Sequence, residues 1–336
     1  MKIGIMGAGS IGCYVGGRLI AAGVDTVLVG RPSLAAEVAA HGMRLTDLHG
    51  FDLTLPPARV AIATEPGALA GCDVVLLTVK GGDTQASAAL LGPVLRHDAL
   101  LVSFQNGVNN AEVLRAALPG RAVLAGMVPF NVLRREGAYF HQGTSGTLAV
   151  ERSRSAAEQP LVRALAQAGL PAAAHEDMLG VMWGKLIVNL NNSVNALSGV
   201  TILEQLASRD YRRVMAACVR EGLQVLAAAG IKPKVDIPLP PRLVPFMLTL
   251  PDVLFRLAAR SMMRIDPQAR SSMWDDLERG RKTEIDALNG EVVRLAQRLG
   301  LTAPINAAVV QLVKAAEGHG SPRLDGRTLR EKISAG

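Results

Sequence analysis

Aromatic residues are scarce in this chain of 336 residues, and that scarcity limits which side chains can build its core. Phe, Trp and Tyr make up only 3% of the residues although 49% are hydrophobic, which indicates a core built from Ala, Leu and Val in α/β and helical layers. The formal net charge is +7. Because the basic residues form scattered pairs without interleaved aromatics, as at Arg134 and Arg135, we expect no nucleic-acid partner.

Cysteine is also rare: Cys13, Cys72 and Cys218 are odd in number and far apart. None belongs to a C-x-x-C motif, and the six histidines show no H-x-x-x-H spacing. We therefore expect reduced thiols in a cytoplasmic protein and no metal site.

Long apolar runs are missing as well. Residues 243–257 are strongly apolar, but prolines and charged residues interrupt them well short of the ~20 residues that a spanning helix requires. At the N-terminus, glycines break the apolar run where a signal peptide needs a continuous helix. We expect no membrane partner.

The first positive signal is a G-x-G-x-x-G motif between a strand-like run at residues 3–6 and an apparent helix. In a dinucleotide-binding fold, the first glycine makes the turn and the second lets the backbone approach a pyrophosphate. The third lets the helix pack on the strand, so that the helix amides face the phosphates. The expected cofactor-binding residues are Gly7, Ala8, Gly9, Ser10, Ile11 and Gly12.

The end of the second predicted strand, at residues 26–29, distinguishes between the two nicotinamide cofactors. NAD-specific folds place an acidic residue there for the ribose 2′-hydroxyl, whereas this chain has Arg31. A guanidinium would bind the 2′-phosphate of NADP instead. The alternative is an ordinary surface arginine at a strand end. We predict NADPH/NADP as the cofactor.

Predicted strands and helices alternate up to about residue 150, which is typical of a Rossmann-type, doubly wound parallel sheet. Two further strands end at Lys80 and at Asn106. Ligands of such sheets bind beyond the carboxyl ends of the strands, so we expect both side chains at the crevice of the glycine turn. Each residue is also common at ordinary strand ends and turns.

Helical periodicity replaces this alternation from about residue 178, which predicts an all-α second domain. We assign residues 1–178 to an NADP-binding domain, 179–320 to a helical substrate domain, and 321–336 to a polar tail that packs weakly. The proline-rich stretch 232–251 resembles an insertion that forms a lid or an oligomer contact. Both a monomer and a homodimer are compatible with the pattern.

A polar stripe interrupts the apolar helix predicted at residues 181–195. Lys185, Asn189 and Asn192 are spaced i, i+4 and i+7 and share one face, with Ser193 at its margin. Burial of a lysine is costly, but a partly desolvated ammonium has a lowered pKa that suits a general acid. The alternative interpretation is a wetted face or a set of polar links between packed helices.

The chain resembles the ketopantoate reductase family, the 2-dehydropantoate 2-reductases, over roughly residues 1–315. The matching segments occur in the family's order and comprise residues 7–12, 79–80, 105–107, 183–186 with 189, 271–273, 282–286 and 289–290. The resemblance implies NADPH-dependent reduction of ketopantoate to pantoate, for coenzyme A synthesis, in a cleft between two domains.

The resemblance also implies a role for individual residues. Arg31 and Lys80 would hold the 2′-phosphate of NADPH, Lys185 would protonate the substrate carbonyl oxygen, and Glu284, the second catalytic residue, would bind or orient the substrate. The resemblance further implies that Asn106, near the nicotinamide, and Asn189 and Ser272 bind or orient the substrate, and the polar stripe adds Asn192 and Ser193 as predicted substrate-binding residues. The roles of Ser272 and Glu284 rest on the resemblance alone.

Two departures from the family pattern concern the substrate. Ser193 and Ala269 stand where the family has asparagines, and the loss of two amides would reshape the pocket. Three hypotheses follow: a ketopantoate reductase, a related reductase of another 2-keto acid or an imine, and a non-catalytic NADPH-binding protein. Retention of Lys185 and Glu284 argues against the third.

Overall fold

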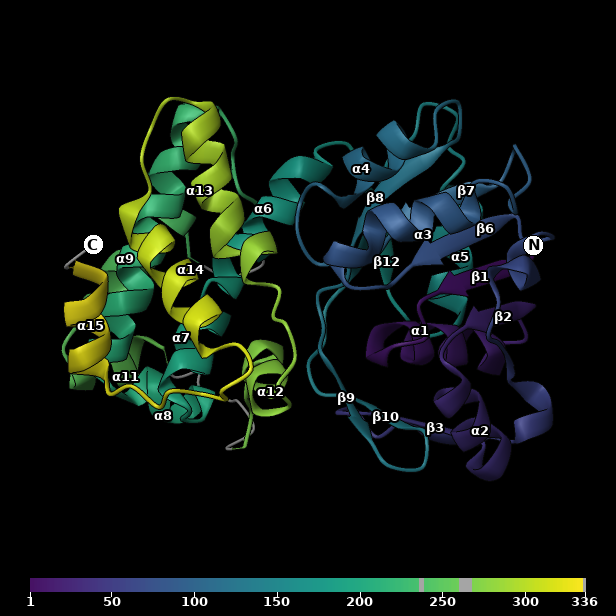
Figure 1. The fold of residues 1–336 in the computed structure, drawn as a ribbon, viewed down its shortest axis with the longest axis horizontal. Helices are drawn as coiled ribbons and strands as arrows, with labels where there is room; N and C mark the ends of the chain where they lie inside the picture. The colour runs from purple at the N-terminus through teal and green to yellow at the C-terminus, as the bar shows by residue number, and fades with distance from the viewer. Residues whose placement is uncertain (236–238, 260–267, 335–336) are drawn as a thin grey trace. The chain divides into compact units, whose positions relative to one another are not determined.

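The computed structural model describes residues 1–235, 239–259 and 268–334. Internal contacts divide the chain into two compact units, Met1–Met178 and Leu179–Gly336. The first unit is coloured purple to teal in Figure 1 and the second teal to yellow; each is described by itself. The predicted fold class is confirmed, because the first unit is a largely parallel α/β sheet and the second is helical.

An eight-stranded sheet forms the core of the first unit, in the order β12-β11-β8-β7-β6-β1-β2-β5. Neighbouring strands are parallel except β8 and β11. The strands β1, β2, β6 and β7 are buried along their whole length, as is usual where both faces of a parallel sheet are covered. The strands are β1 (Ile3–Met6), β2 (Thr26–Val29), β5 (Ala61–Ala63), β6 (Val74–Leu77), β7 (Leu100–Ser103), β8 (Val123–Met127), β11 (Leu148–Glu151) and β12 (Ala172–His175).

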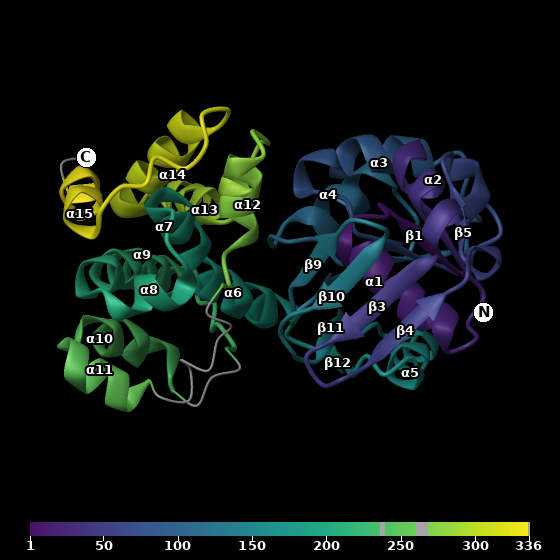
Figure 2. The same cartoon turned by 90° about the horizontal axis from the view of Figure 1, so that it is seen from below.

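A second, four-stranded sheet, in the order β4-β3-β10-β9, belongs to the same unit and was not predicted from the sequence (Figure 2). Helix α1 packs against strands of both sheets, which explains why most of its residues are buried. The strands are β3 (Met43–Asp47), β4 (Asp52–Leu55), β9 (Val132–Arg135) and β10 (Tyr139–Gln142), and the helices are α1 (Ser10–Ala21), α2 (Pro32–His41), α3 (Thr84–Leu91), α4 (Asn110–Ala117) and α5 (Gln159–Gln167).

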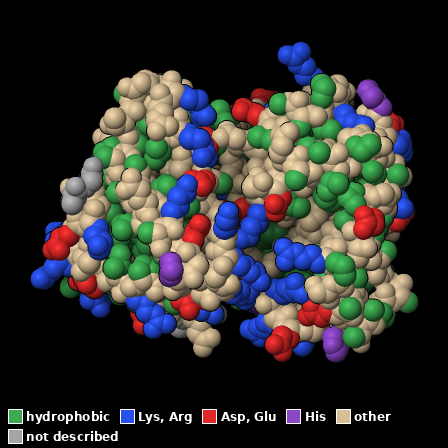
Figure 3. Space-filling model, in the orientation of Figure 1, with side chains coloured by type: hydrophobic (Ala, Val, Ile, Leu, Met, Phe, Trp, Pro, Cys, Tyr) green, Lys and Arg blue, Asp and Glu red, His purple; other side chains and the backbone are tan. Residues whose placement is uncertain are grey.

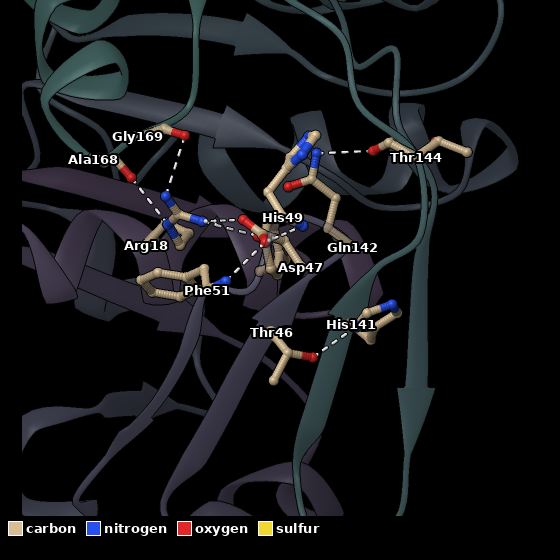
Figure 4. A network of polar contacts seen from close by, with 11 residues as sticks. Arg18, Thr46, Asp47, His49, Phe51, His141, Gln142, Thr144, Ala168 and Gly169 are labelled. Carbon is tan, nitrogen blue, oxygen red and sulfur yellow. Dashed lines mark hydrogen bonds and ion pairs between the residues drawn. The ribbon is translucent and has the colours of Figure 1, made fainter.

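A buried arginine on α1 links the second sheet to the first (Figure 4). The Arg18 guanidinium donates hydrogen bonds to the carbonyl oxygens of Ala168 and Gly169, at 3.0 and 3.2 Å. It also pairs with Asp47 at the end of β3, at 3.5 Å, and lies 3.9 Å from the centre of the Phe51 ring. Arg18 is only 8% exposed, and these contacts supply the hydrogen-bond partners and the opposite charge that a buried guanidinium requires.

The second unit is built around the 20-residue helix α9, against which α10, α13, α14 and α15 pack. The helices are α6 (Met178–Asn189), α7 (Asn191–Ser198), α8 (Ile202–Ala207), α9 (Arg209–Ala228), α10 (Val244–Thr249), α11 (Asp252–Ala258), α12 (Ser272–Glu278), α13 (Asn289–Arg298), α14 (Pro304–Ala316) and α15 (Gly326–Ser334).

Two expectations for this unit need correction. The single helix predicted at residues 181–195 is two helices, α6 and α7, which are separated at Leu190. The tail was expected to pack weakly, yet α15 packs on α9 and buries Leu329 and Ile333. The i, i+4 spacing of these two apolar side chains places them on one helix face, a signal that the polar composition of the tail concealed.

The proline-rich stretch 232–251 is anchored rather than detached, although its residues 236–238 lie outside the described part of the chain. Its helix α10 packs on α9, where the fully buried Arg212 donates to the carbonyl oxygens of Leu248 and Leu250, both at 2.9 Å. Large apolar side chains remain exposed on α10 and α11, namely Phe246, Val253, Leu254 and Leu257. These observations weigh against a lid and leave an apolar surface exposed.

Charged side chains of both signs occur on each unit on the face shown in Figure 3. Many are paired, as Arg96 is with Asp73 and Asp98. This mixture agrees with the scattered basic pairs seen in the sequence.

Candidate active site

The glycine turn has the geometry that its sequence predicts. Gly7 has a φ of +105°, and an added Cβ there would lie 2.6 Å from the Val79 side chain, so only glycine fits. At Gly9, by contrast, no described atom lies within 4 Å of such a Cβ. Because Gly9 is the N-cap residue of α1 and has no side chain to cap the helix, the first-turn amides can receive a phosphate group.

The other predicted cofactor residues follow adjacent strands of the same sheet. Arg31 follows β2, Lys80 follows β6 and Asn106 follows β7, and the sheet order β7-β6-β1-β2 makes all four strands neighbours. Since these strands are parallel, the three side chains and the glycine turn lie at one edge of the sheet. Arg31 and Lys80 are exposed and Asn106 is half-buried.

Arg31 is available for a ligand. Its guanidinium forms no hydrogen bond or ion pair with any residue in the described ranges. Its backbone is held close to the glycine turn, because a Cβ on the preceding Gly30 would lie 2.7 Å from Cβ of Ala8. An uncompensated guanidinium beside a helix N-terminus can bind a phosphate.

A buried glutamine that sequence reasoning did not single out fixes the spacing between Lys80 and Asn106. The Gln105 amide donates to the carbonyl oxygen of Val79 at 3.2 Å and to Oγ1 of Thr84 at 2.8 Å. It therefore joins the loop after β7 to the loop after β6. The sequence signal that could have identified Gln105 is a polar residue directly after an apolar strand.

In the second unit, the charge of Glu284 acts on Lys185, although 99 positions separate the two residues in the sequence. Burial lowers the pKa of Lys185 to about 8, and the negative charge of Glu284 partly opposes this by raising it. Lys185 is on α6 and Glu284 lies just before the short helix η5 (Ile285–Ala287). Both residues are half-buried. An ammonium in this state can give up a proton near neutral pH.

The predicted substrate amides are on the same pair of helices. Asn189 ends α6, Asn192 is in the first turn of α7, and both are half-buried. Neither side-chain amide forms a hydrogen bond within the described part of the chain. Such amides can bind a polar ligand.

Ser193 does not occupy the position predicted for it. The residue is fully buried, and its hydroxyl donates to the carbonyl oxygen of Leu190 at 2.9 Å. A serine one residue beyond the polar stripe rotates toward the helix interior and back-bonds to the preceding turn. The Ser193 hydroxyl is therefore engaged within the helix, and its role as a substrate ligand stays a prediction.

The two serines that begin α12 have different surroundings. Ser272 is exposed, whereas Ser271 is buried and caps the helix by accepting a hydrogen bond from the Trp274 amide at 3.2 Å. Asn195, which was not predicted as a site residue, accepts from the Ser271 amide at 2.9 Å. Asn195 is fully buried. Asn195, which lies outside the predicted stripe, thus links α7 to the start of α12 and sets the position of Ser272.

A chain crossing explains the glycine that precedes Lys185. The Lys234 amide donates to the carbonyl oxygen of Gly180 at 2.9 Å, and a Cβ on Gly184 would overlap the carbonyl oxygen of Lys234. The backbone at Lys234 therefore lies directly on α6, one residue from Lys185. A close approach of two backbones requires a residue without a side chain.

We expect Gly184→Ala to lower the free energy of unfolding by about 1–3 kcal/mol or more, because the added methyl must displace backbone and not a flexible side chain. Thermal unfolding measures the change. Gly71→Ala is the matched control, since its Cβ would meet no described atom within 4 Å. Equal melting temperatures for the two variants would contradict the close approach of the Lys234 backbone to Gly184.

Neither a metal centre nor a membrane helix is found where the structure can be described. Residues 1–235, 239–259 and 268–334 contain no group of three His, Cys, Asp or Glu side chains that could hold a metal ion. Over the same ranges, every helix is too short or too polar to cross a bilayer. The three cysteines are free thiols and buried.

Two family models match the chain: "Ketopantoate reductase PanE/ApbA" over residues 3–154 and "Ketopantoate reductase PanE/ApbA C terminal" over residues 177–317. The 2-dehydropantoate 2-reductase of Archaeoglobus fulgidus is 30% identical, with coverage of 94% of this chain and 98% of that one.

Solved structures give the same match. A PanE/ApbA family ketopantoate reductase from Ralstonia eutropha JMP134 is 32% identical over 94% of this chain and 98% of its own, with a TM-score of 0.80. A D-mandelate dehydrogenase solved with NADH and anilino(oxo)acetate is 21% identical over 94% and 98% of the two chains, with a TM-score of 0.77. The second likeness concerns the fold alone.

Proposed function

The chain belongs to the ketopantoate reductase family, and from this premise we propose that it catalyses the NADPH-dependent reduction of a 2-keto acid, with ketopantoate as the first substrate to test. The observation that carries the proposal is the half-buried Lys185, whose pKa is lowered to about 8 by burial beside the opposing charge of Glu284. A proton donor of this kind is what reduction of a carbonyl group needs.

The residues of the first unit fit NADPH. A helix N-terminus without a side-chain cap, behind an open glycine, suits the pyrophosphate. The Arg31 guanidinium, which is unpaired among the described residues, suits the 2′-phosphate. Lys80 and Asn106 follow neighbouring strands at the same edge of the sheet. When bound, NADPH supplies the hydride that reduces the carbonyl carbon.

The residues of the second unit provide the proton and hold the substrate. As the carbonyl carbon is reduced, negative charge builds on its oxygen, and the Lys185 ammonium stabilises that charge and donates its proton to the oxygen. Glu284 keeps Lys185 protonated by opposing the effect of burial. The amides of Asn189 and Asn192 and the exposed hydroxyl of Ser272 orient the polar groups of the substrate.

A second candidate is a related reductase of another 2-keto acid or of an imine. Ser193 and Ala269 favour it, because they stand where the resemblance leads us to expect asparagines. The Ser193 hydroxyl is committed to Leu190 and so does not replace the missing amide. The pocket would then have fewer polar contacts for its ligand, which changes which substrates it accepts.

Turnover by the purified protein tests both candidates. Loss of NADPH absorbance is followed with ketopantoate, with a panel of other 2-keto acids, and with mixtures of keto acid and amine. Preference for ketopantoate supports the first candidate, and preference for another carbonyl or an imine supports the second. NADPH binding without any turnover would identify a non-catalytic NADPH-binding protein.

We expect turnover to depend on a group that titrates near pH 8. Only the protonated amine can act as the acid, so kcat is expected to fall about tenfold per pH unit above the pKa of Lys185, which burial lowers to about 8. A pH series of kcat measures this limb. Glu284→Gln should move the limb to lower pH, because the charge that raises the pKa is gone. If the fall in kcat occurs at the same pH in Glu284→Gln as in wild type, the attribution of this limb to Lys185 is wrong.

Location and assembly remain predictions. Three free cysteines support a reducing, cytoplasmic environment. The exposed apolar side chains of α10 and α11 offer a surface for a homodimer, and sedimentation of wild type against Phe246→Ser measures whether a monomer or a dimer is present.

A further inference from the structure

A carboxylate at the C-terminal end of α14 holds the turn that carries Glu284. Glu317 is the C-cap residue of that helix. Its Oε1 atom accepts hydrogen bonds from the Thr283 amide at 2.8 Å and from the Thr283 hydroxyl at 2.7 Å. A negative charge at a helix C-terminus opposes the helix dipole, so this position disfavours a carboxylate unless its contacts compensate.

The threonine held in this way directly precedes Glu284. The Thr283 hydroxyl, besides donating to Glu317, accepts a hydrogen bond from the Ile285 amide at 3.3 Å. The Glu284 carbonyl oxygen accepts from the Ala287 amide at 3.0 Å. The backbone on both sides of Glu284 is therefore fixed, on one side through Glu317 and on the other through η5.

The position of Glu284 in turn affects the proton donor. Its carboxylate is the charge that raises the pKa of Lys185 against the effect of burial. An opposite charge acts strongly only within a few ångströms, so displacement of the turn would weaken the pairing. Glu317 itself is not identified by the sequence motifs, which end at residues 289–290.

We propose that Glu317 is a positioning residue for the reductase reaction: by holding Thr283, it fixes where the Glu284 carboxylate stands relative to Lys185 and to the substrate. This inference rests on the proposed function. Glu317 touches neither substrate nor cofactor in this scheme and acts only through Thr283 and Glu284.

A second link joins the same turn to α14 but contributes less. Lys314 pairs with Asp286 at 2.8 Å, with side chains that are 50% and 59% exposed. Exposed pairs of this kind are largely screened by solvent. Glu317 is half-buried and makes two hydrogen bonds to one residue, so it is the stronger constraint.

The test compares Glu317→Ala with Glu317→Gln, whose amide oxygen can still accept from Thr283. For the alanine variant we expect the KM for the keto acid to rise and kcat/KM to fall about tenfold, since displacement of a site by 1 Å can cost up to ~10² in rate, while the affinity for NADPH is unchanged. The glutamine variant should retain most of the wild-type KM. Gln311→Ala, an exposed position on the same helix, is the matched control and should behave as wild type.

A direct titration of Lys185 keeps the inference testable apart from turnover. The rate at which an amine-reactive anhydride labels Lys185, followed by mass spectrometry against pH, gives a midpoint that should shift downward in Glu317→Ala. If wild type binds NADPH but reduces no keto acid, the proposed function fails while this shift still tests the inference.

Thr283→Val serves if Glu317→Ala does not fold, because it removes the hydroxyl that donates to Glu317 and accepts from the Ile285 amide, and should cause the same shifts. Wild-type KM and wild-type labelling in the folded alanine or valine variant would overturn the proposal. An equal shift in Gln311→Ala would also overturn it, since the effect would then belong to α14 as a whole.

Discussion

Lys185→Ala is expected to lower kcat by about 10²–10⁴-fold, the usual contribution of a general acid, while NADPH binds as tightly as before. The substitution removes the ammonium that, in the proposed function, stabilises and protonates the carbonyl oxygen. It leaves the glycine turn and Arg31 in the first unit untouched. Steady-state turnover and a separate NADPH binding titration measure the two effects.

Two further variants show which property of Lys185 matters. Lys185→Arg keeps the positive charge but cannot release a proton at physiological pH, so it should recover little of the lost kcat. Val188→Ala changes an exposed side chain on the same helix and should leave turnover unchanged. A Lys185→Ala enzyme with near wild-type kcat would exclude Lys185 as the acid.

Arg31→Ala is expected to weaken NADPH binding by about 10- to 100-fold, because a hydrogen bond to a charged group contributes about 1.5–3 kcal/mol. NADH lacks the 2′-phosphate, so its affinity should change little. Dissociation constants for both cofactors, measured on wild type and variant, give the ratio directly. Arg163→Ala, at an exposed arginine of α5, is the control.

The ratio of the two affinities decides the role of Arg31. A loss confined to NADPH identifies Arg31 as the residue that binds the 2′-phosphate. An equal loss for NADPH and NADH would mean that the arginine supports the loop after β2 and does not distinguish the cofactors. Lys80 would then be the remaining candidate for the phosphate contact.

The first unit could be predicted largely from the sequence because its signals are local. The glycine motif spans six residues, 7–12, and its conformation depends on their own lack of side chains. Arg31, Lys80 and Asn106 were then brought together by one general rule, that parallel strands end at the same edge of a sheet. The four-stranded second sheet escaped prediction because β3 pairs with β10, nearly a hundred residues further along the chain.

The second unit was predicted less well because the sequence does not indicate whether its polar side chains face a ligand or a neighbouring helix. Helical spacing placed Lys185 and Asn189 correctly on one helix, α6. The same spacing did not reveal that the helix is interrupted at Leu190, that Ser193 bonds back to the preceding turn, or that Asn195 binds the start of α12.

The sequence by itself determined the family, the glycine turn and the residue types of the candidate site, because each depends on short motifs whose order along the chain is enough to identify them. Only the tertiary structure decided which of the predicted side chains are accessible and what holds them in place. The electrostatic effect of Glu284 on Lys185, the hydrogen bonds of Thr283 with Glu317 and the close approach of Gly184 to Lys234 each join segments far apart in sequence. Such contacts follow from how helices pack, which no local pattern specifies.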